Sequence, residues 1–202
     1  RISNEAILTS LKGNKGPVHI NIPLREPLYD TINKSTGLPK IISTVNTHAQ
    51  LPQEEWNNIV KEWNTSERKL ILVGQCQPDS RLTSALTALA VDRSVVVMTE
   101  TTSNVHVSSQ IACIDRTIEG LSNNFNDYQP DILLTLGGEI VSKKIKALLR
   151  KNKPSQHWHI NIDGRIIDTY QSLTKIIPSD SINFLEGLVE MADPQWNGTY
   201  SE

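Results

Sequence analysis

Residues 130–150 read PDILLTLGGEIVSKKIKALLR, and this stretch predicts a strand, a glycine turn, a short loop and a helix. The apolar run 132–136 alternates little between apolar and polar positions, which indicates a strand covered on both faces. Gly137 and Gly138 end that strand and permit a sharp turn. Ser142 is a good N-cap for the helix that follows. The apolar face of this helix carries Ile145, Leu148 and Leu149.

Two lysines, Lys143 and Lys144, stand in the first turn of the predicted helix, where the helix dipole is already positive. Cations stabilise a helix at its other end, by about 0.3–1 kcal/mol each, so these two work against local stability. With free backbone N–H groups at the helix start they make an anion site, at a strand end where open α/β sheets bind ligands. The alternative is two solvated lysines on a helix that is basic throughout.

The same alternation of strands and helices continues on both sides of this unit. The predicted strands are 70–73, 95–98, 132–136, 159–162 and 176–177. The predicted helices start at Pro52, at Asp79 or Ser80, near Thr117, after Ser142 and at Ser181. We therefore predict an α/β fold with a doubly wound, mainly parallel sheet and helices on both faces, a Rossmann-like domain. The tryptophans of the first of these helices, Trp56 and Trp63, fit a core position, or a seal against a neighbouring domain, better than a binding site.

The first 50 residues have a different character. A helix over 3–12 and a short strand with Val18, Ile20 and Ile22 alternating are expected, followed by a polar linker over 30–50. A lone helix and strand cannot bury their apolar faces, so they need the rest of a domain outside this chain or must lie on the domain that follows. We assign 51–192 to the central domain and 193–202 to a tail.

Composition narrows the class of protein. A net charge of −2 gives no reason to expect a nucleic acid or an anionic membrane as partner, and the short apolar runs predict no membrane span. The first residues do not form a signal peptide, and the missing initial Met suggests a fragment. Cys76 and Cys113 lack metal or redox spacing, so we expect free thiols and a cytoplasmic protein.

Catalytic and cofactor motifs are mostly missing from the sequence. No glycine fingerprint for a dinucleotide, no phosphate loop and no nucleophile elbow follows a strand. His157 and His159 point the same way on a strand, but without a nearby carboxylate or cysteine we do not expect a metal site. Asp163, Arg165 and Asp168 are expected to form a turn with a surface ion pair rather than a ligand site.

One segment resembles a known family. Residues 16–29, GPVHINIPLREPLY, closely resemble the segment that closes the pyrimidine-binding domain in the MenD family of thiamine-diphosphate enzymes. The glycine turn followed by Ser142, Lys143 and Lys144 is similar to a loop with a basic pair in the same family. The stretch 163–165 after the next strand is similar as well.

The resemblance implies a function. Residues 1–29 would be the end of a pyrimidine-binding domain, and the parent would be a synthase of menaquinone biosynthesis that decarboxylates 2-oxoglutarate on thiamine diphosphate and adds the product to isochorismate. It implies thiamine diphosphate and Mg²⁺ (or Mn²⁺) in the parent, none bound to this fragment, which alone should be inactive. It also implies dicarboxylate substrates held by Lys143 and Lys144, missing pyrimidine- and pyrophosphate-binding domains of the same protein, and a homodimer or homotetramer. A Lys at the second position lacks the bidentate fork of Arg.

Two other functions compete with this one. The central domain can be purely structural, with both lysines solvated and the domain only holding its neighbours in place. It can also be an independent nucleotide- or cofactor-binding domain, which the missing glycine fingerprint argues against.

Overall fold

Five parallel strands form one sheet in the order β2-β1-β3-β4-β5. The computed structural model describes residues 2–11, 15–26, 51–121, 125–196 and 198–202. The strands are β1 (Lys69–Val73), β2 (Val95–Thr99), β3 (Ile132–Leu136), β4 (Gln156–Ile160) and β5 (Lys175–Ile177). All residues of β1 and β3 are buried, as their mainly apolar sequences with little alternation predict for strands covered on both faces. The order is one of the two common doubly wound arrangements, so the predicted fold class is confirmed.

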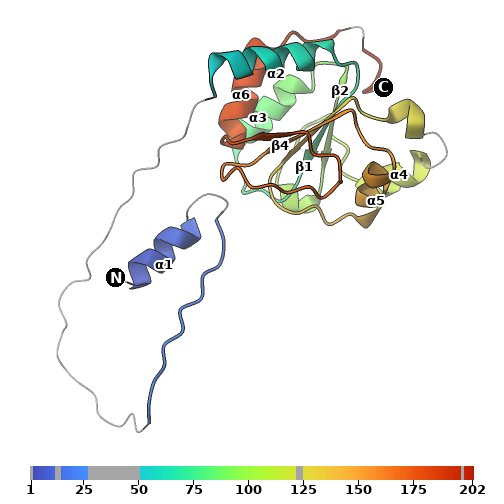
Figure 1. Ribbon diagram of the computed structural model, residues 1–202. Coiled ribbons are helices and arrows are strands. Elements are labelled where there is room, and N and C mark those ends of the chain that lie inside the picture. The colour runs from blue at the N-terminus through green and yellow to red at the C-terminus, as the bar shows by residue number, and fades with distance from the viewer. Residues whose placement is uncertain (1, 12–14, 27–50, 122–124, 197) are drawn as a thin grey trace. The chain divides into compact units, whose positions relative to one another are not determined.

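Helices cover both faces of the sheet (Figure 1). The helices of this part of the chain are α2 (Gln53–Thr65), α3 (Ser80–Leu89), α4 (Ile114–Leu121), α5 (Lys143–Lys151) and α6 (Ser181–Met191), with the short 3-10 helices η1 (Thr101–Ser103) and η2 (Phe125–Tyr128). Alternate residues of each strand pack against α2, α3 and α6 on one face and against α4 and α5 on the other. The domain therefore has three layers with two separate apolar cores.

Both tryptophans of α2 belong to the first core, as expected. The ring of Trp63 lies 6.2 Å from that of Trp158 in β4, and Trp56 stacks on Phe184 of α6 with centroids 5.0 Å apart. The starts of α3 and α6 agree with the predicted helix starts, and the side chains of Asp79 and Asp180 cap these two helices. Pro52 differs slightly from expectation, because it is the extended residue before α2 and not its first helical residue.

A buried ion pair fixes the start of β1. Lys69 is fully buried, and its Nζ lies 3.2 Å from Asp92 Oδ2 and 2.5 Å from Ser94 Oγ. The same ammonium lies 5.4 Å from the centre of the Trp63 ring, a cation–π arrangement. Burial lowers the pKa of Lys69, while Asp92 opposes that shift.

The final residues pack on the amino-terminal edge of the sheet. The side-chain amide of Gln195 donates to the backbone carbonyls of Asn64 and Ser66, and the backbone carbonyl of Gln195 accepts from Arg93 N at 3.2 Å. Tyr200 donates to the carbonyl of Tyr128 at 3.0 Å. The predicted tail, 193–202, is thus hydrogen-bonded to the domain along much of its described length.

The N-terminal segment differs from the prediction. The chain divides into two compact units, Arg1–Thr47 and His48–Glu202. In the first unit the expected helix is present as α1 (Ile2–Leu11), but the described residues 15–26 contain no strand. Val18, Ile20 and Ile22 alternate as in a strand, but their side chains are exposed. The alternation alone does not make a strand, because a strand needs a neighbour to pair its backbone. The predicted linker over 30–50 lies outside the described residues.

Among the residues that the structure describes, no helix combines the length and the apolar character that crossing a bilayer requires.

Candidate functional site

The loop between β3 and α5 carries the predicted basic pair to the carboxyl edge of the sheet. Gly137 leaves the strand with φ +78°, a conformation that favours glycine. Ser142 caps α5 as predicted, since its Oγ accepts a hydrogen bond from Ile145 N at 3.2 Å. Lys143 and Lys144 are the first residues of α5, at the edge where ligands bind in open α/β sheets.

The two lysines have different surroundings. The Lys144 ammonium forms an ion pair with Glu119 of α4, and the hydrogen bond to this carboxylate raises the pKa of Lys144. Both side chains are largely exposed, so solvent screens the pair and it adds little stability. Lys143 is exposed and has no ion-pair partner within the described part of the chain. Its ammonium group is therefore available to an anion.

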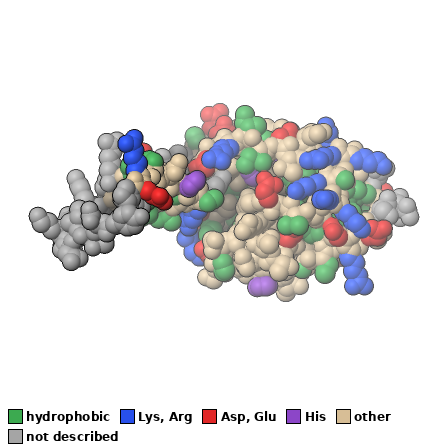
Figure 2. Space-filling view, turned by 90° about the horizontal axis from the view of Figure 1, so that it is seen from below, with side chains coloured by type: hydrophobic (Ala, Val, Ile, Leu, Met, Phe, Trp, Pro, Cys, Tyr) green, Lys and Arg blue, Asp and Glu red, His purple; other side chains and the backbone are tan. Residues whose placement is uncertain are grey.

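Lysine and arginine side chains gather on the face of the domain on which α5 lies (Figure 2). Five cations come from α5 itself, namely Lys143, Lys144, Lys146, Arg150 and Lys151. Only the first two stand at the carboxyl edge of the sheet. The other three lie farther along the helix, away from that edge. Because doubly wound domains bind ligands at the carboxyl edge, the first turn is the part of this basic surface best placed to contact one.

Two backbone N–H groups just before α5 are already hydrogen-bonded, which corrects one part of the predicted anion site. The carboxylate of Glu100, the residue after β2, accepts hydrogen bonds from Val141 N and Ser142 N, each at 2.7 Å. These two N–H groups are therefore not available to an anionic ligand, which can still reach the exposed lysine ammonium groups. Sequence reasoning missed Glu100 because the contact spans more than 40 residues. The available signal was its position after a neighbouring strand.

The crevice between β1 and β3, where strand order reverses and doubly wound proteins usually bind a cofactor, is closed. Gly74 N donates to Leu136 O at 2.9 Å, and Gly138 N donates to Gln75 O at 2.8 Å. A Cβ atom on Gly74 would lie 2.0 Å from Gly138 O. The segments that leave β1 and β3 thus pack backbone against backbone at Gly74 and Gly138.

The two histidines of β4 form a buried polar cluster with Thr135 of β3. Thr135 Oγ1 lies 3.0 Å from His157 Nε2 and 2.9 Å from His159 Nδ1. Ser172 Oγ lies 3.3 Å from the other ring nitrogen of His157. These contacts satisfy the rings inside the second core, and burial lowers the pKa of both histidines, that of His157 to about 4.

This cluster predicts a loss of stability in mild acid. Because the pKa of His157 is lower in the folded protein than the value of about 6.5 in an unfolded chain, the unfolded state binds more protons between pH 4 and pH 6.5. The free energy of unfolding should fall by about 2 kcal/mol between pH 8 and pH 5 from His157 alone. Urea titrations at both pH values measure the difference in the free energy of unfolding.

His157→Gln should remove most of this pH-dependent difference. His106→Gln, at an exposed histidine, should leave the difference unchanged. Equal pH dependence in both variants would contradict the assignment.

The turn after β4 contains the other polar residues singled out from the sequence. Arg165 Nε lies 3.9 Å from Asp163 Oδ2, a loose surface ion pair. Asp168 Oδ1 accepts from Ser172 N at 2.9 Å and from Leu173 N at 3.1 Å. The expected turn with a surface ion pair is confirmed. Cys76 and Cys113 are free thiols, also as expected.

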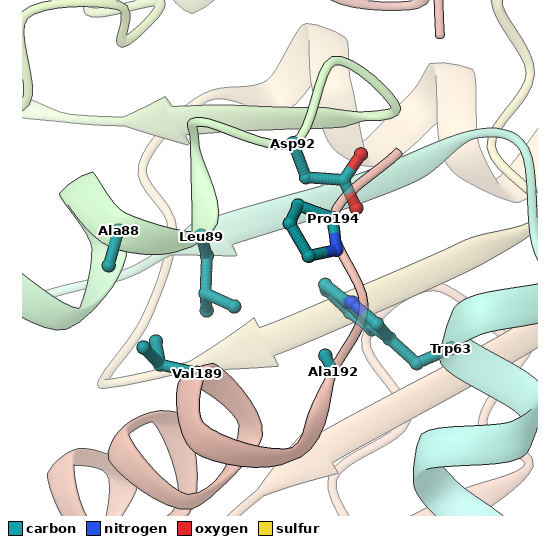
Figure 3. A pocket seen from close by; sticks show the side chains of 7 residues that line it. All are labelled: Trp63, Ala88, Leu89, Asp92, Val189, Ala192 and Pro194. Atoms are coloured by element: carbon teal, nitrogen blue, oxygen red, sulfur yellow. The ribbon is translucent and has the colours of Figure 1, made fainter. Parts of the chain in front are cut away.

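A small cavity of about 60 Å³ lies at the opposite, amino-terminal edge of the sheet (Figure 3). It is lined by Trp63, Ala88, Leu89, Asp92, Val189, Ala192 and Pro194. Its one charged lining residue, Asp92, is engaged by Lys69 and Ser94. No predicted site residue lines this cavity, so it does not compete with the loop before α5.

Comparison with known protein families identifies the family of this domain. The sequence model of the family described as the middle domain of thiamine pyrophosphate matches residues 35–200. The chain therefore belongs to this family of thiamine pyrophosphate enzyme middle domains.

Relatives narrow the type of enzyme, because three bacterial proteins similar to this chain all bear the name 2-succinyl-5-enolpyruvyl-6-hydroxy-3-cyclohexene-1-carboxylate synthase. The protein of Flavobacterium psychrophilum is 48% identical, and the match covers 82% of this chain and 30% of that protein. The protein of Flavobacterium johnsoniae is 43% identical, with 92% of this chain and 34% of that protein covered. The protein of Christiangramia forsetii is 44% identical, with 80% of this chain and 29% of that protein covered. The chain thus spans about a third of the length of these relatives. The predicted resemblance to MenD is confirmed.

Proposed function

We propose that this chain serves as the central domain of a longer thiamine-diphosphate-dependent synthase of menaquinone biosynthesis. In this proposal the whole enzyme decarboxylates 2-oxoglutarate and adds the product to isochorismate, and the isolated chain is inactive. Family membership and the names of the relatives support the reaction. Domain bounds of 1–29, 30–50, 51–192 and 193–202 belong to the same proposal.

Thiamine diphosphate and its Mg²⁺ or Mn²⁺ are proposed to be held by other domains of the enzyme. The described residues do not fit a diphosphate at the usual position, because Gly138 O occupies the space beside Gly74. They also contain no cluster of three or more His, Cys, Asp or Glu side chains that could hold a metal ion. The contribution of this domain is then a contact to substrate and not to the cofactor.

Lys143 is proposed to bind a substrate carboxylate, with Lys144 as a second and weaker contact. The observation that carries this proposal is the exposed Lys143 ammonium at the carboxyl edge, beside a Lys144 that Glu119 already engages. Both proposed substrates carry two carboxylates, which need cationic partners. A charge-assisted hydrogen bond of this kind contributes about 1.5–3 kcal/mol.

Lys143→Ala in the full-length synthase should raise the KM of one dicarboxylate substrate about tenfold or more, with a smaller change in kcat, because it removes a binding contact. Steady-state kinetics with 2-oxoglutarate and isochorismate varied in turn measure it. Lys151→Ala, at an exposed lysine in the last turn of α5, is the matched control and should leave both constants unchanged. Unchanged kinetics in Lys143→Ala would favour a purely structural domain.

Two further parts belong to the proposal, the first supported by the resemblance to the family and the second by the sequence, with its free thiols Cys76 and Cys113. These are a homodimer or homotetramer as the assembled form and the cytoplasm as its location. An independent nucleotide-binding domain is disfavoured by the closed crevice, and nucleotides should not raise the melting temperature of the chain.

A further inference from the structure

The loop that leads to Lys143 is held largely by groups outside its own sequence. Within it, Ile140 is buried, but Val141 is 70% exposed and so gains little from packing. Its backbone is fixed by Glu100, whose two carboxylate oxygens accept from consecutive N–H groups. Hydrogen bonds to a charged acceptor are about twice as strong as neutral ones. The direction in which Lys143 leaves the loop therefore depends on Glu100.

Glu100 is itself firmly placed. Ser103 Oγ accepts a hydrogen bond from Glu100 N at 2.9 Å and donates one to Val73 O at 2.7 Å. Ser103 is fully buried, so this link to the end of β1 excludes water. Glu100 thus connects the end of β1, through its backbone N–H and Ser103, to the loop before α5, through its carboxylate.

Helix α4 supplies a second support to the same turn. Asp115 and Glu119 lie four residues apart and so share one face of α4. Asp115 accepts a hydrogen bond from Ser142 Oγ, and Glu119 pairs with Lys144. Three carboxylates therefore surround the loop and engage its backbone, its cap and its second lysine, and Lys143 is the cation that they leave to a ligand.

We infer that Glu100 is a positioning residue for substrate binding, which holds the loop 139–142 so that Lys143 presents its ammonium group to a dicarboxylate. This inference rests on the proposed function of Lys143. It assigns to Glu100 a geometric role, through two N–H groups, and not a contact with the substrate. A purely electrostatic role would have the opposite effect, because removing a negative charge beside two lysines would strengthen the binding of an anion.

The test uses three variants of the full-length synthase. Glu100→Ala removes both acceptors and should raise the KM of the dicarboxylate that Lys143 contacts about five- to tenfold, with kcat changed less than about twofold. Glu100→Gln keeps one acceptor oxygen without the charge and should restore part of the KM. Asp180→Ala is the matched control, because Asp180 also accepts from two backbone N–H groups, at the start of α6, but does not touch this loop. It should lower the melting temperature and leave the KM unchanged.

A second measurement reports on the loop itself. Hydrogen exchange of the Val141 and Ser142 amides should be faster in Glu100→Ala than in the unchanged protein. A lower KM in both Glu100 variants, or an unchanged KM in Glu100→Ala, would overturn the inference. If Lys143→Ala raises the KM and Glu100→Ala does not, only the role of Glu100 fails. If Lys143→Ala leaves the KM unchanged, the proposed function fails as well.

Discussion

Asp92→Ala is expected to lower the free energy of unfolding by about 3–5 kcal/mol, the largest effect of any single substitution considered. The carboxylate is the ionic partner of Lys69, whose side chain is fully buried. Without Asp92, a buried ammonium remains with one hydroxyl partner, Ser94, and the Trp63 ring. Leaving a charge uncompensated in the core costs far more than losing an ordinary contact. Chemical denaturation at pH 7 measures the effect.

Two controls separate a buried charge from a lost contact. Glu186→Ala breaks the exposed ion pair with Arg81 and should cost little, since solvent screens that pair. Raising the pH should partly rescue Asp92→Ala, because a lysine whose pKa falls on folding binds fewer protons in the native state than in the unfolded one. Stability then rises with pH up to the ordinary pKa of lysine. A loss as small as that of Glu186→Ala would contradict the prediction.

Gly74→Ala should also destabilise the domain strongly, by about 3 kcal/mol. The added Cβ atom would lie 2.0 Å from Gly138 O and 2.9 Å from Gly138 C, both of them backbone atoms that cannot rotate away. Relief requires separating β1 from β3 at their carboxyl ends, where Gly74 N donates to Leu136 O. Thermal and urea unfolding of the variant measure the loss.

Gly120→Ala provides the matched control for that substitution. Gly120 lies in α4 with nothing within 4 Å of its added Cβ. Alanine favours a helix over glycine by about 1 kcal/mol, so this variant should be slightly more stable than the unchanged protein. A comparable loss in both glycine variants would show that the cost at Gly74 does not come from the close approach of Gly138.

Local patterns were enough to predict the layers of the fold. The mainly apolar sequences of β1 and β3, the cap at Ser142 and the helix 181–191 were each read from a few neighbouring residues and are present as expected. These features depend on short-range chemistry, namely the period of apolar residues and the hydrogen bonds of a cap. The basic pair was placed at the right edge for the same reason.

The missed features depend on partners far away in the chain. The alternation of Val18, Ile20 and Ile22 has the period of a strand, but pairing requires a neighbour that no local pattern supplies. The position of Glu100 after β2 places it at the carboxyl edge, but it does not predict which backbone groups its carboxylate binds before α5. The predicted strand 70–73 leaves out Lys69, whose charge is buried against Asp92 at the start of β1.

The closed crevice between β1 and β3 has a consequence for how such a domain changes over evolutionary time. Because Gly74 and Gly138 pack backbone against backbone, the residues that hold β1 and β3 together and the exposed lysines proposed to meet a substrate are different sets. A lineage can alter the exposed Val141 and the lysines after it without repacking either core, whereas a change at Ile140 would disturb the second core. The fold can therefore be retained while the residues at the carboxyl edge, and with them the specificity, change.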